Sequence, residues 1–173
     1  MSASKNTPTY KRQRFLLELA QRINEPVFAT DFQKIMFLCM KQTGRDDYEF
    51  VPYKYGPYSF QLAEDVETLR RSGFLSGTSH KIVVANPIPE NDATASVSIP
   101  AERGDALMRK TYRAFPYYTV NSEILQRLFG SHPVELDHLR GERKRLKQED
   151  RVLFTIGYEG RSLEAFLNDL IKI

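Results

Sequence analysis

Val66-Glu67-Thr68-Leu69-Arg70-Arg71-Ser72-Gly73-Phe74-Leu75 is the stretch of this 173-residue chain that decides the predicted fold. Its valine and first leucine recur at helical spacing, its glycine is typical of a helix end, and its last two residues open an apolar strand. We therefore predict a helix over residues 59–72 that buries Leu62, Val66 and Leu69. A strand follows it directly, so the stretch indicates a mixed α+β fold.

Apolar runs after this stretch continue the pattern. Ile82-Val83-Val84-Ala85 and residues 94–99 read as the two strands of a hairpin, joined by a polar, proline-containing tip at 86–92. Three further helices follow in the predicted order, over residues 101–114, 122–129 and 133–148. Pro133 suits the first position of the last of these helices.

The chain before the opening stretch predicts two more helices and an aromatic turn. Residues 10–24 carry apolar side chains at helical spacing and read as an amphipathic helix. Thr30-Asp31-Phe32-Gln33 matches a capping box and opens a second, nearly apolar helix that extends to about Thr43. Residues 48–52 then read as an extended segment. Tyr53-Lys54-Tyr55-Gly56-Pro57-Tyr58 reads as a turn rich in aromatic side chains.

A different pattern begins near the C-terminus. Val152 to Ile156 is an apolar run, Gly157 and Gly160 mark a turn, and Ser162 is placed to cap a helix. We expect these residues to form the first βα unit of an α/β domain, truncated because its second strand would begin beyond Ile173. The expected parts are a domain over residues 1–130, a basic connecting helix over 131–150 and an incomplete βα unit over 151–173.

Three blocks of the sequence resemble known families. Residues 66–75 resemble the end of the third helix and the second strand of winged helix-turn-helix regulators, and residues 98–107 resemble the segment after their wing. Residues 48–59 look like the Tyr-Gly-Pro-aromatic-Ser block of bacterial and archaeal winged-helix-like domains, which Panacea antitoxin domains share more loosely. Residues 155–162 are similar to the start of an uncharacterised Rossmann-like domain family.

These resemblances together imply one architecture. It is an α+β winged helix-turn-helix with extra N- and C-terminal helices, followed by the truncated first βα unit of an α/β domain. The chain departs from the winged-helix pattern at one point, since the usual second helix is missing or reduced to the turn at 53–57. No settled activity follows from the resemblances, because a fold does not by itself imply a function.

Composition sets the broad class of the protein. The chain is 41% hydrophobic and 27% charged, with a net charge of +3, which permits an anionic partner without demanding one. A single cysteine, Cys39, lies in an apolar helical run and is expected to be a buried small hydrophobe. One cysteine allows no disulfide within the chain, and no apolar run reaches membrane-spanning length. We therefore expect a cytoplasmic protein with no membrane association.

The first functional hypothesis is a regulatory protein that binds DNA mainly through the phosphate backbone, as a homodimer paired through its first helix or its fifth and sixth helices. The outward face of the third helix is acidic, which opposes base reading in the major groove. Basic groups elsewhere would supply the phosphate contacts. The candidate contact residues are Lys54, Arg71, His80, Lys81, Arg140, Arg143, Lys144 and Arg145.

The second hypothesis is a protein-interaction module, antitoxin-like or defence-associated. It would hold a protein partner through the acidic face of the third helix and the aromatic turn. The candidate partner-binding residues are Tyr55, Tyr58, Gln61, Glu64, Asp65 and Thr68. The aromatic turn alternatively packs against its own core, which we favour over base stacking. A third hypothesis is the regulatory domain of an enzyme whose α/β domain is not contained in this stretch.

The sequence shows no pattern for catalysis, metal binding or a cofactor. His80, His132, His138 and Cys39 lack the spacing of a metal site, and no paired carboxylates or Ser/His/Asp arrangement stands out. Residues 157–162 place a Gly-x-x-Gly turn before a helix, where a phosphate could bind, but the fuller dinucleotide pattern is missing. We predict no metal, no cofactor and no catalytic residue in this chain.

Overall fold

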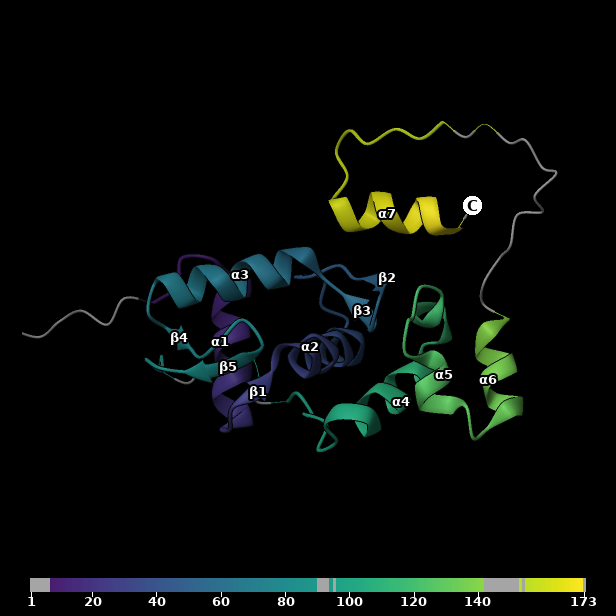
Figure 1. Cartoon of the computed structure of the whole chain (residues 1–173). Helices are drawn as coiled ribbons and strands as arrows, with labels where there is room; N and C mark the ends of the chain where they lie inside the picture. The colour runs from purple at the N-terminus through teal and green to yellow at the C-terminus, as the bar shows by residue number, and fades with distance from the viewer. Residues whose placement is uncertain (1–6, 90–93, 95, 142–152, 154, 173) are drawn as a thin grey trace, which may run out of the picture.

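The computed structural model describes residues 7–89, 94, 96–141, 153 and 155–172 (Figure 1). Within these residues the chain is a mixed α+β protein, which confirms the predicted class. The helices are α1 (Lys11–Ile23), α2 (Ala29–Thr43), α3 (Phe60–Arg71), α4 (Gly104–Ala114), the 3-10 helix η2 (Pro116–Thr119), α5 (Leu125–Phe129), α6 (Pro133–Arg140) and α7 (Leu163–Lys172). The strands are β1 (Val27–Phe28), β2 (Val51–Tyr53), β3 (Gly56–Tyr58), β4 (Leu75–Ser76) and β5 (Lys81–Val84).

The strands form two small antiparallel sheets. The first has the order β1-β5-β4, with Val27 opposite Ile82 and Leu75 opposite Val84. The second is the hairpin β2–β3, which replaces the predicted aromatic turn and pairs Val51 with Tyr58. The strand β5 is therefore central in its sheet, and the short turn between β4 and β5 closes the second hairpin.

The predicted strand over residues 94–99 is wrong for the part of it that the structure describes. Both edges of β5 are already paired, with β1 on one side and β4 on the other, so no ladder is left for a further strand. Thr94 and Val97 are instead buried against α1, where their carbonyl groups accept hydrogen bonds from Arg22. The hairpin tip consequently lies at residues 77–80 and not at 86–92.

The helix α2 lies at the centre of the molecule, as its apolar sequence predicts. Phe37 is fully buried and makes edge-to-face ring contacts with Phe50, Phe115 and Tyr118 at centroid distances of 5.2, 4.9 and 4.6 Å. Cys39 is also fully buried, which confirms its prediction as a small core residue, and burial raises the pKa of its thiol to about 11. The aromatic contacts of α2 join it to η2 and to Phe50, the residue before β2, which positions the β2–β3 hairpin.

The capping box predicted at the start of α2 is wrong. The helix begins at Ala29, with Phe28 as its N-cap and no side-chain cap. Asp31 instead accepts the backbone N–H of Gly104 with both carboxylate oxygens, each at 3.1 Å, and Gln33 exchanges two hydrogen bonds with the backbone of Ser59. Both side chains are buried, so they tie α2 to the first turns of α4 and α3 and not to its own backbone.

The C-terminal half contains shorter elements than the sequence predicts. The helices α4 and α5 begin at Gly104 and Leu125, and α6 ends at Arg140, while residues 142–148 of the longer predicted helix lie outside the described residues. The side chains of α4, α5 and α6 share a second apolar cluster. Leu128, Phe129 and Leu139 are buried in it.

The predicted strand over residues 152–156 has no support in the described residues. Leu153 is 90% exposed, and residues 153, 155 and 156 make no strand, while Val152 and Phe154 lie outside the described residues. The predicted helix after Ser162 is confirmed as α7, and the Ser162 hydroxyl accepts the N–H of Ala165 at 3.0 Å. Among the described helices, none combines the length and apolarity that crossing a bilayer requires.

Candidate interaction surface and cavity

The helix α3 is the best-predicted element of the candidate surface. Leu62, Val66 and Leu69 are buried as expected, and the Ser59 hydroxyl caps the helix by accepting the N–H of Leu62 at 3.2 Å. Most of the predicted partner-binding residues lie on the accessible side, with Tyr55, Gln61 and Glu64 exposed and Tyr58 and Thr68 half-buried.

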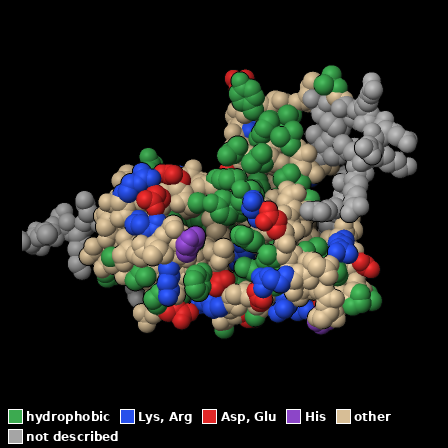
Figure 2. Space-filling view, in the orientation of Figure 1, with side chains coloured by type: hydrophobic (Ala, Val, Ile, Leu, Met, Phe, Trp, Pro, Cys, Tyr) green, Lys and Arg blue, Asp and Glu red, His purple; other side chains and the backbone are tan. Residues whose placement is uncertain are grey.

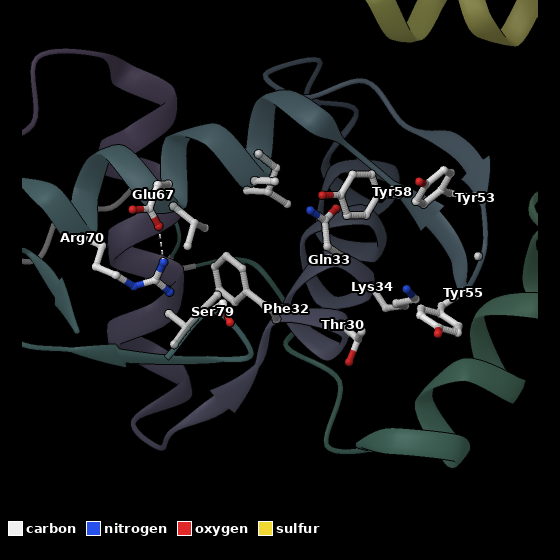
Figure 3. Close-up of a pocket in the computed structure, with 16 residues that line it drawn as sticks. Thr30, Phe32, Gln33, Lys34, Tyr53, Tyr55, Tyr58, Glu67, Arg70 and Ser79 are labelled. Atoms are coloured by element: carbon white, nitrogen blue, oxygen red, sulfur yellow. Dashed lines mark hydrogen bonds and ion pairs between the residues drawn. The ribbon is translucent and has the colours of Figure 1, made fainter. Parts of the chain in front are cut away.

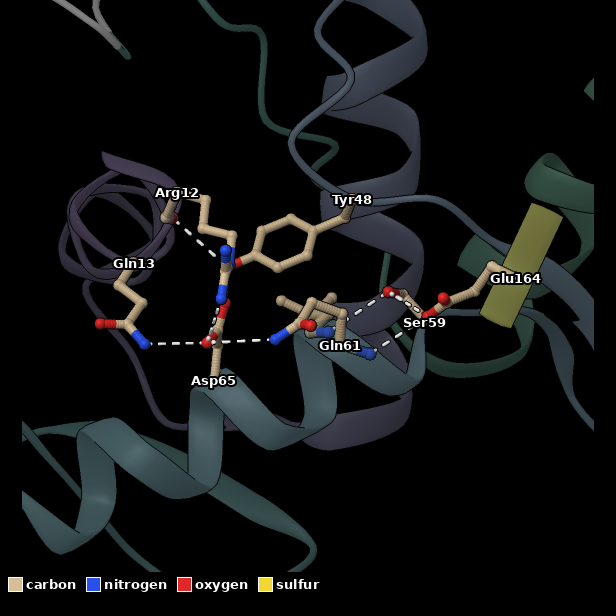
Figure 4. Close-up of polar contacts among 8 residues, drawn as sticks. Arg12, Gln13, Tyr48, Ser59, Gln61, Asp65 and Glu164 are labelled. Atoms are coloured by element: carbon tan, nitrogen blue, oxygen red, sulfur yellow. Dashed lines mark hydrogen bonds and ion pairs between the residues drawn. The ribbon is translucent and has the colours of Figure 1, made fainter. Parts of the chain in front are cut away.

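Asp65 corrects this prediction, because it is buried with an exposed fraction of 2%. Its carboxylate accepts hydrogen bonds from Arg12 Nε at 2.6 Å, Gln13 Nε2 at 2.8 Å and Tyr48 Oη at 2.9 Å (Figure 4). The Asp65 bond raises the pKa of Arg12, and burial raises the pKa of Tyr48. Asp65 therefore fixes α3 to α1 and is not available to a partner.

The remaining charges of α3 neutralise one another. Glu67 accepts a hydrogen bond from Arg70 at 2.5 Å, and Arg71 lies 3.2 Å from Glu64 and 3.6 Å from Glu67. Arg70 also donates to the Thr78 carbonyl in the β4–β5 turn at 3.0 Å. The two arginines at the end of α3 are thus engaged by carboxylates of the same helix.

The N-terminal end of α3 is covered by α7. Glu164 of α7 is buried, and one of its carboxylate oxygens accepts the Gln61 N–H at 3.1 Å and the Ser59 hydroxyl at 3.3 Å (Figure 4). A carboxylate is favourable there because the first N–H groups of a helix are unpaired and carry a partial positive charge. Asn168 of α7 adds bonds to the Phe50 carbonyl at 2.7 Å and to Tyr117 Oη at 2.9 Å.

The predicted DNA-contacting residues do not form one surface. Lys54 lies 3.2 Å from Glu123. Arg140, at the end of α6, donates to Gln126 at 2.6 Å, and Figure 1 places α6 at the opposite end of the molecule from β4. His80 and Lys81 are exposed beside the β4–β5 turn, near the end of α3 that carries Arg71. Arg143, Lys144 and Arg145 lie outside the described residues.

The aromatic residues of the β2–β3 hairpin are partly packed and partly exposed. Tyr58 contacts Tyr53 and Phe60 at ring-centroid distances of 5.2 and 5.0 Å, which supports the predicted packing role. Tyr53 and Tyr55 nevertheless remain 40% and 43% exposed. Gly56 permits the hairpin to approach α4, because its φ is +95° and a Cβ there would lie 2.5 Å from the Tyr112 ring. Figure 2 shows hydrophobic side chains gathered on this face.

A cavity of about 340 Å³ lies between α2, α3, the β2–β3 hairpin and the β4–β5 turn (Figure 3). Its lining is mostly apolar. The side chains on its wall include Phe32, Tyr53, Tyr55, Tyr58, Leu62, Val66 and Ile82, together with Gln33, Lys34, Glu67, Arg70 and Ser79. Two of the predicted partner-binding residues, Tyr55 and Tyr58, thus border this cavity.

Lys34 is a buried, charged lining residue that the sequence prediction missed. It is 2% exposed, and burial lowers its pKa from 10.5 to about 8, against an opposing contribution from Asp31. Its place among Phe32, Ile35 and Phe37 in a largely apolar helix is the signal in the sequence that could have indicated its burial. Glu164, by contrast, carries no comparable pattern.

No group of three or more His, Cys, Asp or Glu side chains in the described residues is arranged to hold a metal ion. Comparison with known proteins assigns no family and no function to the chain. No protein-family model, no curated protein and no solved structure matches the chain.

Proposed function

We propose that this chain is a winged-helix-like protein-interaction module. The order of its elements supports the winged-helix part of the proposal. The helices α1, α2 and α3 precede β4 and β5, β1 follows α1, and β5 lies between β1 and β4 in the sheet. That is the element order of a winged helix, with the β2–β3 hairpin inserted between the second and third helices. On this assignment α2 is the second helix that the sequence pattern lacked.

The covered N-terminus and the paired charges of α3 favour a protein partner over DNA. In helix-turn-helix proteins the N-terminal residues of the recognition helix contact base edges in the major groove. Here Glu164 and α7 cover that end of α3, and the exposed carboxylates of Glu64 and Glu67 engage the nearby arginines. A helix with this surface would bring negative charge to the phosphates without a free cation to offset it.

The accessible groups around α3 suit a protein partner. Exposed tyrosines on the β2–β3 hairpin supply the residue type most often found at interface centres, and the half of α3 with Gln61, Glu64 and Thr68 supplies a polar rim. The partner would place apolar side chains against Tyr53 and Tyr55 and basic or polar groups against Glu64. Asp65 is left out of this surface because it is buried.

Differential co-purification followed by reconstitution tests the proposal. The wild-type chain, Glu64→Lys and Tyr55→Ala are compared with Asp137→Lys, a matched control on α6 whose side chain is 76% exposed. We expect a protein that the wild type and the control retain and that both surface variants lose. The purified pair should then show at least a tenfold loss of affinity in Glu64→Lys, about 1.4 kcal/mol. Equal retention by all four chains contradicts the proposed surface.

DNA binding through the phosphate backbone is the second candidate function. The observation that favours it is the pair His80 and Lys81, which are exposed and have no carboxylate partner among the described residues. They lie beside the short β4–β5 turn, where a winged helix has its wing. Homodimer formation and the Rossmann-like assignment of the C-terminal residues remain predictions.

A further inference from the structure

Three charged side chains, Lys34, Glu67 and Arg70, line the cavity beside α3, and Glu67 and Arg70 pair with each other. Lys34 extends from α2 to the cavity wall, and Figure 3 shows its amine directed toward the Tyr55 ring. Its exposed fraction is 2%, so the protein and not solvent determines its surroundings.

Among the described residues, Lys34 forms no ion pair, and none of the hydrogen bonds that line the cavity is donated by its ammonium group. The nearest charged neighbour on its own helix, Asp31, gives both carboxylate oxygens to the Gly104 N–H. The carboxylate on the cavity wall, Glu67, is engaged by Arg70 at 2.5 Å. The amide oxygen and nitrogen of Gln33 are engaged as well, because both bond the backbone of Ser59.

A buried ammonium without a counter-ion is costly, since charged groups in protein interiors are normally paired. A ligand anion placed in the cavity would offset this cost through a charge-assisted hydrogen bond. The rest of the wall selects the body of such a ligand. Phe32, Tyr58 and Val66 present rings and methyl groups, and a volume of about 340 Å³ is at the lower end for small-molecule sites, which suits one or two rings.

The geometry points to a binding site for a small aromatic monocarboxylate, with the carboxylate on Lys34 and the ring against the apolar wall of α2 and α3. The ring would lie between Phe32 and Tyr58, and its carboxylate would face the β2–β3 turn. This inference goes beyond the proposed function and does not depend on it, because it rests on the cavity and on Lys34 alone.

Isothermal titration of the full chain with matched ligand pairs tests the site. The probes are 2-naphthoate and indole-3-acetate, each with its neutral carboxamide. At pH 7 we expect the wild type to bind at least one carboxylate roughly tenfold more tightly than the matched amide, because a hydrogen bond to a charged group is the stronger one. Lys34→Met should bind both forms equally. Lys41→Met, an exposed lysine of the same helix, should keep the wild-type preference.

A second variant tests whether binding requires the space of the cavity, independently of the Lys34 charge. Ala63→Phe adds a ring to the α3 side of the cavity and should abolish binding of carboxylate and amide alike. Circular dichroism melting establishes that each variant is folded. Absence of carboxylate binding to the folded wild type at millimolar concentration overturns the inference. Equal binding of carboxylate and amide by the wild type, or a preference that survives in Lys34→Met, also overturns it.

Discussion

At the scale of single residues, two buried charged side chains differ in whether the protein supplies them with hydrogen-bond partners. Asp65 is surrounded by donors from α1 and from the segment before β2, whereas Lys34 lines a mostly apolar cavity and forms no ion pair among the described residues. We expect that replacing Asp65 destabilises the fold and that replacing Lys34 stabilises it. Substitution at each position distinguishes the two cases.

Asp65→Ala should lower the free energy of unfolding by about 3 kcal/mol, because removing one member of a buried charged network leaves its partners unpaired. Arg12 is partly exposed, and this places the value at the lower end of that class. Urea unfolding at neutral pH measures the change. Glu64→Ala, one position earlier on the exposed side of α3, is the matched control and should change stability by less than about 0.5 kcal/mol. Similar losses for both variants would contradict the role given to Asp65.

Lys34→Met should stabilise the protein in a pH-dependent way. Because the pKa of Lys34 is lowered from 10.5 to about 8 by burial, the folded chain binds its proton less strongly than the unfolded chain. Stability of the wild type is therefore reduced below pH 8, recovers between pH 8 and 10.5, and is unaffected above that range. From the cost of each pKa unit, the electrostatic gain of the variant should fall from about 3 kcal/mol at pH 6.5 to about 1 kcal/mol at pH 9.5. A gain that is independent of pH would contradict the burial of a charged amine.

At the scale of elements, local sequence patterns predicted the helices better than the strand pairing. The inward face of α3 was predicted correctly because Leu62, Val66 and Leu69 share one side of a single helix. The pairing of β5 with β1 was not predicted, because β1 has two residues and lies more than fifty positions earlier in the chain. The same limit applies to Asp65, whose bonding partners come from distant segments.

The contact between α7 and α3 is the element-scale feature with the most direct test. Glu164→Ala should remove the carboxylate at the N-terminus of α3 and weaken the docking of α7 by about 1 to 2 kcal/mol. Hydrogen exchange should show faster exchange for the amides of α7 and for Gln61 N–H. Glu159→Ala, an exposed glutamate that precedes α7, should leave both regions unchanged. Unchanged protection in Glu164→Ala would mean that Glu164 does not hold α7 in place.

At the scale of the whole molecule, a net charge of +3 gives little guidance to function. Many of the arginines and lysines in the described residues are paired with carboxylates, including Lys54, Arg71 and Arg140 of the predicted DNA-contacting set. The sequence therefore indicated which of the proposed surface residues are accessible, apart from Asp65, but not their electrostatic state, which depends on side chains that only the fold brings together.

Fluorescence anisotropy of the chain with a labelled random-sequence duplex, titrated with salt, tests the central claim most directly. The account predicts no measurable binding at low salt, because the described face of α3 offers no free cation and α7 covers its N-terminal end. Micromolar binding that falls steeply with salt and is lost in Lys81→Ala would contradict it, and would assign the chain to the nucleic-acid-binding proteins.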